Sequence, residues 1–142
     1  MIFTTLVIEN FGVYRGENRF ELRPKVEGDD ARTIVVFGGK NGSGKTTILE
    51  AIRLCLYGRA SLGSRVRKRD YETYVAQRLH RDLDNHRAQR AQIRLTFEHT
   101  HAGVKSVYEA IRFWVQDGKT LLEQVQVFKD GVTLHDIPAE HW

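Results

Sequence analysis

A glycine-rich run that ends in Lys-Thr-Thr, GGKNGSGKTT at residues 38–47, holds the residue types that bind a polyphosphate. Residues 39–46 fit the spacing G-x-x-x-x-G-K-[ST]. In such a loop the glycines let successive backbone N–H groups, here those of residues 41–46, point at phosphate oxygens. Lys45 would neutralise the β- and γ-phosphates, the Thr46 hydroxyl would be a ligand to Mg²⁺, and Thr47 would donate to the α-phosphate. The spacing therefore predicts a nucleoside triphosphate site.

The elements on either side of this loop are those that the motif requires. Before it, TIVVF at residues 33–37 is wholly apolar and β-branched, which predicts a short buried strand. After it, apolar residues recur at the spacing of one helical face, and Gly58 is placed to end that helix. The apolar residues of this face are Ile48, Ala51, Ile52, Cys55 and Leu56. Cys55 is thus predicted to be a core residue. A chance match of the motif on an ordinary strand, loop and helix is the alternative.

The rest of the chain reads mainly as antiparallel strands. Residues 2–8 and 18–22 alternate in hydropathy and flank a turn-rich segment, ENFGVYRGEN. Three further alternating runs lie at 93–97, 107–115 and 121–127, and HTHAG, QDGK and KDGV separate or end them. Asp-Gly is a strong signal for a short hairpin. The pattern predicts an antiparallel meander over residues 91–136.

Composition limits the class of protein. The chain has 142 residues, of which 41% are hydrophobic, and no apolar run long enough to cross a bilayer. With one cysteine there is no disulfide framework, and the start MIFTTLVIEN lacks the features of a secretion signal. We therefore expect a cytoplasmic protein without a membrane partner. The net charge of +4 permits nucleic acid as a partner but does not require it.

The excess positive charge lies in residues 59–90, which hold nine Lys or Arg against four Asp or Glu. The segment begins with a polar loop and continues into a sparse apolar stripe that fits a moderately amphipathic helix. This stripe consists of Tyr71, Tyr74, Val75, Leu79 and Leu83. The basic residues expected to contact a DNA backbone are Arg59, Arg65, Arg67, Lys68 and Arg69, with Arg78, Arg81, Arg87 and Arg90 beyond them. A solvated, charge-rich linker is the alternative.

Three segments together resemble a known family. LVIENFGVYRGENRFEL, VVFGGKNGSGKTTILEAIRLCLYG and the trailing antiparallel strands resemble the N-terminal half-head of the SMC-like ATPases, which include chromosome-structure proteins and double-strand-break repair ATPases. Two strands precede the loop here, whereas in small GTPases and nucleotide kinases the loop follows the first strand. Within the group, the FGVYRG turn, the FGGKNGSGKTT loop and the basic stretch after LYG are most similar to the ATPase of bacterial DNA phosphorothioate (sulfur) modification.

The resemblance implies an α/β P-loop NTPase fold, the N-terminal half of an ABC/SMC-type ATPase head with an antiparallel β meander. Residues 1–142 would form one N-terminal lobe, with strands, loop and helix at 1–58, the basic loop and helix at 59–90, and the antiparallel strands at 91–136. ATP and Mg²⁺ are the implied cofactors. The implied partners are the chain's own C-terminal lobe, a second head that sandwiches ATP against the first, DNA, and other subunits of a modification complex.

The nucleotide contacts carried over from the family match Gly39, Asn41, Gly42, Ser43, Gly44, Lys45, Thr46 and Thr47. At the first turn, break-repair relatives often carry Asn-Phe-Arg-Ser, where this chain has Asn-Phe-Gly-Val-Tyr-Arg from residue 10 to residue 15. Arg15 would take over the basic role near the nucleotide, with Tyr14 near the base or ribose. Both could equally be solvated turn residues.

The sequence also departs from a complete enzyme. It contains no Q-loop, no signature motif such as L-S-G-G, and no apolar strand ending in an Asp-Glu pair. We therefore expect a fragment, cut before a coiled coil and without hydrolytic activity of its own. The alternative functions are an SMC-like ATPase of DNA repair or anti-phage defence, a small P-loop kinase, and a nucleic-acid-binding module whose P-loop is only structural.

Six histidines, among them His86 and the pair His99 and His101, are expected to be isolated from metal ligands.

Overall fold

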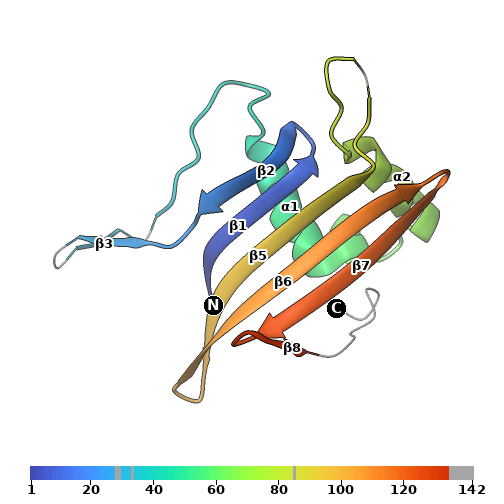
Figure 1. Ribbon diagram of the computed structural model, residues 1–142. Helices are drawn as coiled ribbons and strands as arrows, with labels where there is room; N and C mark the ends of the chain where they lie inside the picture. Colours follow the sequence, from blue (N-terminus) through green and yellow to red (C-terminus); the bar gives the residue numbers. More distant parts are fainter. Residues whose placement is uncertain (28–29, 33, 85, 135–142) are drawn as a thin grey trace.

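The computed structural model describes residues 1–27, 30–32, 34–84 and 86–134, and its main feature is a six-stranded antiparallel sheet (Figure 1). The strand order is β2-β1-β5-β6-β7-β8, and every neighbouring pair is antiparallel. The strands are β1 (Ile2–Phe11), β2 (Tyr14–Glu21), β5 (Arg90–His101), β6 (Val104–Asp117), β7 (Thr120–Lys129) and β8 (Val132–Leu134). A separate two-stranded sheet consists of β3 (Lys25–Glu27) and β4 (Asp30–Arg32).

The predicted meander is confirmed as far as residue 134, while residues 135–136 of the prediction lie outside the described residues. Its short turns explain why consecutive strands pair. Asp130 and Gly131 join β7 to β8 with φ values of 50° and 79°. Two consecutive positive φ values are the geometry of a type I′ turn, whose twist matches that of the flanking strands. Ala102 and Gly103 join β5 to β6 in the same way, with φ values of 48° and 80°.

The helices lie on one face of this sheet (Figure 1). They are α1 (Lys45–Tyr57), the 3₁₀ turn η1 (Gly58–Leu62) and α2 (Lys68–Arg78). The helix expected after the glycine loop is therefore confirmed, and it ends where predicted, because the Gly58 N–H bonds to the Leu54 carbonyl. Gly58 has a φ of 49°, and a Cβ there would lie 2.7 Å from the Arg112 guanidinium, so glycine alone fits this position.

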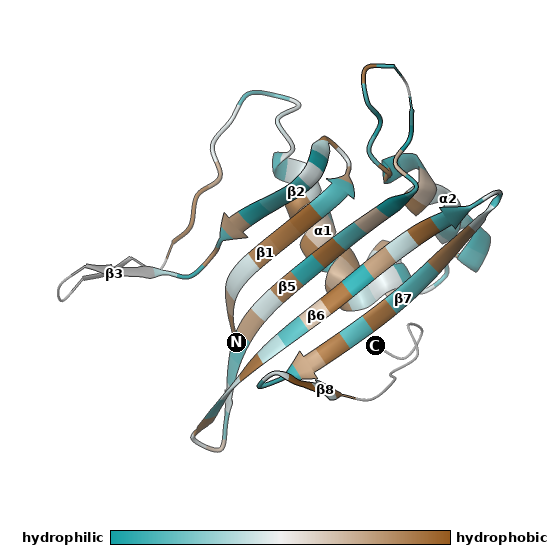
Figure 2. Ribbon diagram, in the orientation of Figure 1, coloured by the Kyte–Doolittle hydropathy of each residue, from teal (hydrophilic) through white to brown (hydrophobic). Residues whose placement is uncertain are grey.

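The core lies between this face of the sheet and the helices. Apolar and polar bands alternate along β1, β5, β6 and β7, as a half-buried sheet requires (Figure 2). The buried side chains from the sheet include Leu6, Ile8, Ile93, Leu95, Ala110 and Trp114. Cys55 on α1 is fully buried among them, as predicted, and burial raises the pKa of its thiol to about 12. This cysteine is a core residue and not a nucleophile.

A charged side chain sits at the centre of the core. Arg112 on β6 has no exposed surface, and its Nη1 donates to Glu123 Oε1 at 2.8 Å, while its Nε donates to the Cys55 carbonyl at 3.2 Å. The same carboxylate oxygen accepts bonds from Trp114 Nε1 at 3.0 Å and from the Tyr71 hydroxyl. Burial and then the Glu123 carboxylate raise the pKa of Tyr71. The network joins the end of α1, the strands β6 and β7, and α2.

Two expectations about elements were wrong. Residues 34–37 of the expected strand 33–37 pair with no strand that the structure describes, and Thr33 lies outside the described residues. Ile34 and Val36 are 80% and 82% exposed. A continuous apolar run is the pattern of a strand hydrogen-bonded on both sides, and no described strand is hydrogen-bonded to this one. The second error concerns the basic helix, which ends at Arg78, so that Leu79 is buried beyond its end while Leu83 is fully exposed.

None of the helices in the described part of the chain has the length and apolar character needed to span a lipid bilayer.

We predict that Arg112→Met destabilises the fold by about 2–4 kcal/mol, because it leaves the half-buried Glu123 carboxylate without its charged partner. The double variant Arg112→Met/Glu123→Gln should lose less than the sum of the two single variants, since the unpaired charge is then absent. Urea denaturation followed by circular dichroism measures each free energy of unfolding. Losses that add without coupling would contradict this account of the pair.

Candidate nucleotide site

The glycine-rich loop lies between the unpaired segment 34–37 and α1. It turns on glycines with positive φ, 82° at Gly42 and 94° at Gly44, and the Ser43 N–H bonds to the Lys40 carbonyl at 3.2 Å. Gly44 is the N-cap of α1, and its carbonyl accepts the first helical bond, from the Ile48 N–H at 3.1 Å. The N-terminal amides of α1 and the partial positive charge of its dipole thus lie directly after the loop.

Lys45 folds back across this loop. Its Nζ donates to the Gly39 carbonyl at 2.7 Å and to the Lys40 carbonyl at 2.8 Å, while the side chain remains exposed. The ammonium group therefore lies beside the backbone of the loop that would surround a phosphate. A polyphosphate can take over these bonds, since phosphate oxygens are stronger acceptors for an ammonium group than peptide carbonyls are.

The two threonines that follow the lysine have different surroundings. Thr46 is exposed, so its hydroxyl is accessible to a hydrated Mg²⁺. Thr47 is half-buried and faces Gly12, where an added Cβ would lie 2.7 Å from the Thr47 methyl group. The residues present fit Mg²⁺, with Thr46 as the protein ligand and water as the remaining ligands.

The β1–β2 turn contacts the glycine loop at Gly44. The Tyr14 hydroxyl donates to the Gly44 carbonyl at 3.1 Å, and a Cβ on Gly44 would lie 2.6 Å from both Val13 and Tyr14. Burial raises the pKa of Tyr14. On its other side the turn contacts α2, because the Gly12 N–H donates to the Arg78 carbonyl at 2.6 Å. The turn therefore lies between the N-terminus of α1 and the C-terminus of α2.

The sequence predicts that the β1–β2 turn lies near the nucleotide, but it does not predict the contact between Tyr14 and Gly44. Tyr14 was expected near a base or ribose, and the structure brings its hydroxyl to the backbone of the loop. Arg15 follows on β2 with an exposed side chain, and its role near the nucleotide stays a prediction. The packing of Gly12 on Thr47 was missed, although the Asn-Phe-Gly-Val departure at residues 10–13 was a signal for it.

The residues predicted to contact DNA have different surroundings in the structure. Arg65 and Arg67 are exposed in the loop before α2. Lys68 lines a cavity of about 380 Å³, whereas Arg69 lines a second one of about 740 Å³. Arg78 forms an ion pair with Glu50 of α1, with 3.1 Å between its Nε and the carboxylate, so its charge is already compensated. DNA contact by residues 65–69 stays a prediction.

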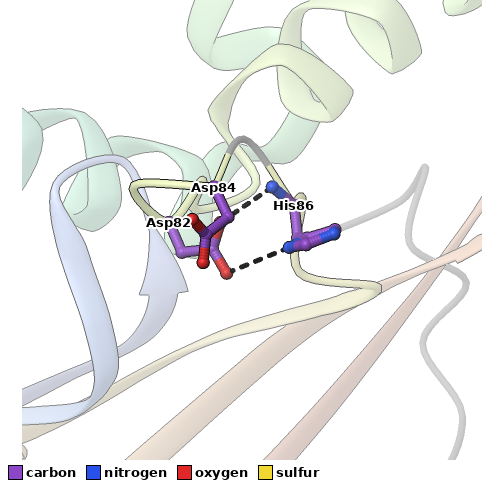
Figure 3. A group of neighbouring side chains, drawn as sticks. All are labelled: Asp82, Asp84 and His86. Carbon is purple, nitrogen blue, oxygen red and sulfur yellow. Dashed lines mark hydrogen bonds and ion pairs between the residues drawn. The ribbon is translucent and has the colours of Figure 1, made fainter.

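One group of side chains was missed entirely. Asp82, Asp84 and His86 carry ligand-type atoms that lie within 4.8 Å of one another, so the expectation that His86 is isolated was wrong (Figure 3). The alternating spacing at 82, 84 and 86 was the available signal. The His86 N–H donates to Asp82 Oδ1 at 2.8 Å, and its Nδ1 lies 3.6 Å from Asp82 Oδ2. These contacts close the loop that holds the three residues.

Comparison with known families gives one match over most of the chain. A family model described as an AAA domain matches residues 5–134. No curated protein matches the sequence. The matched range includes the β1–β2 turn, the glycine loop, both helices, most of β1 and the five other strands of the large sheet.

We predict that Gly44→Ala weakens Mg-ATP binding at least tenfold. The methyl group would lie 2.6 Å from Val13 and Tyr14, and the φ of 94° costs an alanine about 1–2 kcal/mol. Gly16→Ala is the matched control, because Gly16 also has a positive φ, 62°, but a Cβ there meets nothing within 4 Å. Calorimetric titration of both variants measures the difference. Equal weakening in the two would mean that general backbone strain, and not crowding at the loop, is responsible.

Proposed function

The chain belongs to this AAA-domain family of SMC-like P-loop ATPases, and we propose that its residues 39–47 bind Mg-ATP in the N-terminal lobe of a two-lobed ATPase head. The observation that carries the proposal is the position of Lys45. Its Nζ bonds to the Gly39 and Lys40 carbonyls across a glycine loop that opens directly into α1. A cation, free helical amides and a flexible loop are the components of a phosphate cradle.

Each residue has a distinct role in this proposal. The N–H groups of residues 41–46 and the Lys45 ammonium hold the phosphates, and Thr46 holds Mg²⁺. Bound Mg²⁺ would neutralise charge that develops on the β- and γ-phosphate oxygens. Tyr14 fixes the Gly44 carbonyl, and Thr47 packs on Gly12, so the β1–β2 turn holds the start of α1 in place.

Hydrolysis is proposed to require a second lobe. The sequence supplies no Asp-Glu pair after an apolar strand, no Q-loop and no signature motif. In addition, the apolar segment 34–37 leads into the loop without a neighbouring strand, and Figure 2 shows it as a brown stretch before the loop. Apolar β-branched residues exposed in this way favour pairing with a further strand. We propose that the C-terminal lobe supplies that strand, and that a second head completes the site.

The finer proposal is that the protein is DndD, the ATPase of DNA phosphorothioate modification, and couples ATP turnover to DNA processing in the cytoplasm with other subunits of a modification complex. Support comes from the FGVYRG turn, which contacts the loop through Tyr14, and from the basic stretch after LYG. An SMC-like ATPase of DNA repair or anti-phage defence is the alternative. A small P-loop kinase is the alternative of another class, and it would need both an acidic metal site and an acceptor pocket within this chain.

We predict that Mg-ATP binds the 142-residue chain, that Lys45→Ala abolishes this binding, and that neither form releases phosphate above background. The lysine ammonium is needed to neutralise the phosphates, while the residues that polarise the attacking water are missing. Calorimetric titration with a phosphate assay on the same samples measures both quantities. Turnover that disappears in Lys45→Ala would establish a self-sufficient enzyme and would reopen the kinase alternative.

For the finer proposal, we predict that Lys45→Ala in the full-length protein removes phosphorothioate linkages from the DNA of cells that carry it. Mass spectrometry of nuclease-digested DNA measures these linkages. Lys129→Ala is the matched control, because Lys129 is an exposed lysine on β7 and lies outside residues 39–47. DNA without such linkages in the unaltered strain would reject phosphorothioation while leaving the ATP site untouched.

A further inference from the structure

A basic cavity of about 740 Å³ lies at α2, away from the glycine loop, since no residue of 39–47 lines it. Its walls come from α2, from the loop that follows it and from the β6–β7 hairpin. The cationic residues that line it are Arg69, Arg81, Arg87 and Lys119, and Glu72 is the one acid among its lining residues. This volume lies within the range of pockets that hold small molecules.

One face of α2 forms the first wall. The lining residues of this helix follow the i, i+3, i+4, i+7, i+8 spacing, so they share one face. They are Arg69, Glu72, Thr73, Ala76 and Gln77. The opposite face of α2 carries Tyr71 and Val75 into the core. Because those two side chains pack the helix against the sheet, the face that carries Arg69 points away from the core.

The loop after α2 forms the second wall, and backbone hydrogen bonds join its two ends. Arg81 and Arg87 form an antiparallel bridge, the Asp82 N–H donates to the His86 carbonyl at 3.0 Å, and the Ala88 N–H donates to the His80 carbonyl at 2.8 Å. Figure 3 shows the Asp82 carboxylate directed at His86. Asp82 and Asp84 therefore face His86 and are not among the residues that line the cavity, whereas both arginines are.

The β6–β7 hairpin forms the third wall. Gln116 and Lys119 come from it, and the Gln116 N–H donates to the Gln89 carbonyl at 2.7 Å, which ties the hairpin to the end of the loop. The Gln116 side chain also bonds to the Gly118 carbonyl at 2.8 Å. Three segments separated in sequence thus bring four cations to one cavity.

The chemistry of this lining selects an anion with many acceptor oxygens. Arginine presents a planar fork of donors that fits phosphate, and the side-chain amides of Gln77 and Gln116 add uncharged donors. None of the described residues that line the cavity is aromatic, so they offer no platform on which a base could stack.

We propose that this cavity is a second phosphate-binding site, in which Arg69 of α2 and Lys119 of the hairpin converge on the phosphate groups of a nucleic-acid backbone or of a free polyphosphate. The inference goes beyond the proposed ATP site, because the two share no residue. Contacts would be made to phosphate alone, without readout of base sequence.

The test uses the 142-residue chain with Lys45→Ala, so that phosphate binding at the glycine loop is removed. Arg69→Ala/Lys119→Ala is compared on this background with Arg19→Ala/Lys129→Ala. The control pair removes one arginine and one lysine, both exposed, from β2 and from the far end of β7. The probes are a 20-base-pair duplex DNA and inorganic tripolyphosphate, with polyglutamate as the non-phosphate polyanion. Affinities are measured from 50 to 200 mM salt, with circular dichroism to verify folding.

We expect the cavity variant to bind a phosphate probe at least tenfold more weakly than the control variant. For the duplex, the slope of log affinity against log salt should fall by about 0.9 for each phosphate contact that is lost. A duplex bound in preference to tripolyphosphate identifies the ligand as a nucleic-acid backbone, and the reverse identifies a free polyphosphate. Equal weakening in both variants, no binding of either phosphate probe at 50 mM salt, or polyglutamate bound as tightly as the phosphates would overturn the proposal.

Discussion

The buried guanidinium of Arg112 is the constraint on which the rest of the structure depends. A charge without contact to water is tolerated only with a partner and with hydrogen bonds, so the residues around it have little freedom. Glu123 must point inward from β7, the Cys55 carbonyl must face β6, and Gly58 must lack a side chain. Tyr71 then joins the same carboxylate and brings α2 onto the sheet. One ionic contact thus sets the positions of both helices.

The two ends of α1 are consequently held by different kinds of contact. Its C-terminal end is fixed in the core by Arg112, while its N-terminal end rests on the β1–β2 turn through Tyr14 and through the packing of Gly12 on Thr47. The glycine loop therefore begins a helix that cannot easily shift, which favours a site whose backbone donors are preorganised. On the loop's other side, residues 34–37 pair with no described strand, and the Phe37 ring packs edge to face on Phe20 of β2, with 6.1 Å between the ring centroids.

Local patterns in the sequence predicted those parts of the structure that depend on local physics. Helical spacing identified α1 and its end at Gly58, and the Asp-Gly turns indicated the hairpins of the meander. What failed depends on tertiary contacts. The strand at 33–37 required a partner that composition cannot reveal, and Arg112 reads in an alternating strand like any solvent-facing residue. The basic cavity was also out of reach, because its cations lie between residues 69 and 119 and meet only through the fold.

The basic residues between 59 and 90, which the sequence analysis treated as one surface, have different surroundings in the structure. Of the basic residues between 59 and 90, Arg78 is neutralised by Glu50 and serves to hold α2 against α1. Arg69 occupies the face of α2 that points away from Tyr71, so the same helix contacts the core network on one side and the cavity on the other. From Lys45 at the start of α1, bonded contacts run through Cys55, Arg112, Glu123 and Tyr71 to that helix. The half-buried Glu123 carboxylate therefore links, through hydrogen bonds, the helix that follows the glycine loop and the helix that lines the basic cavity.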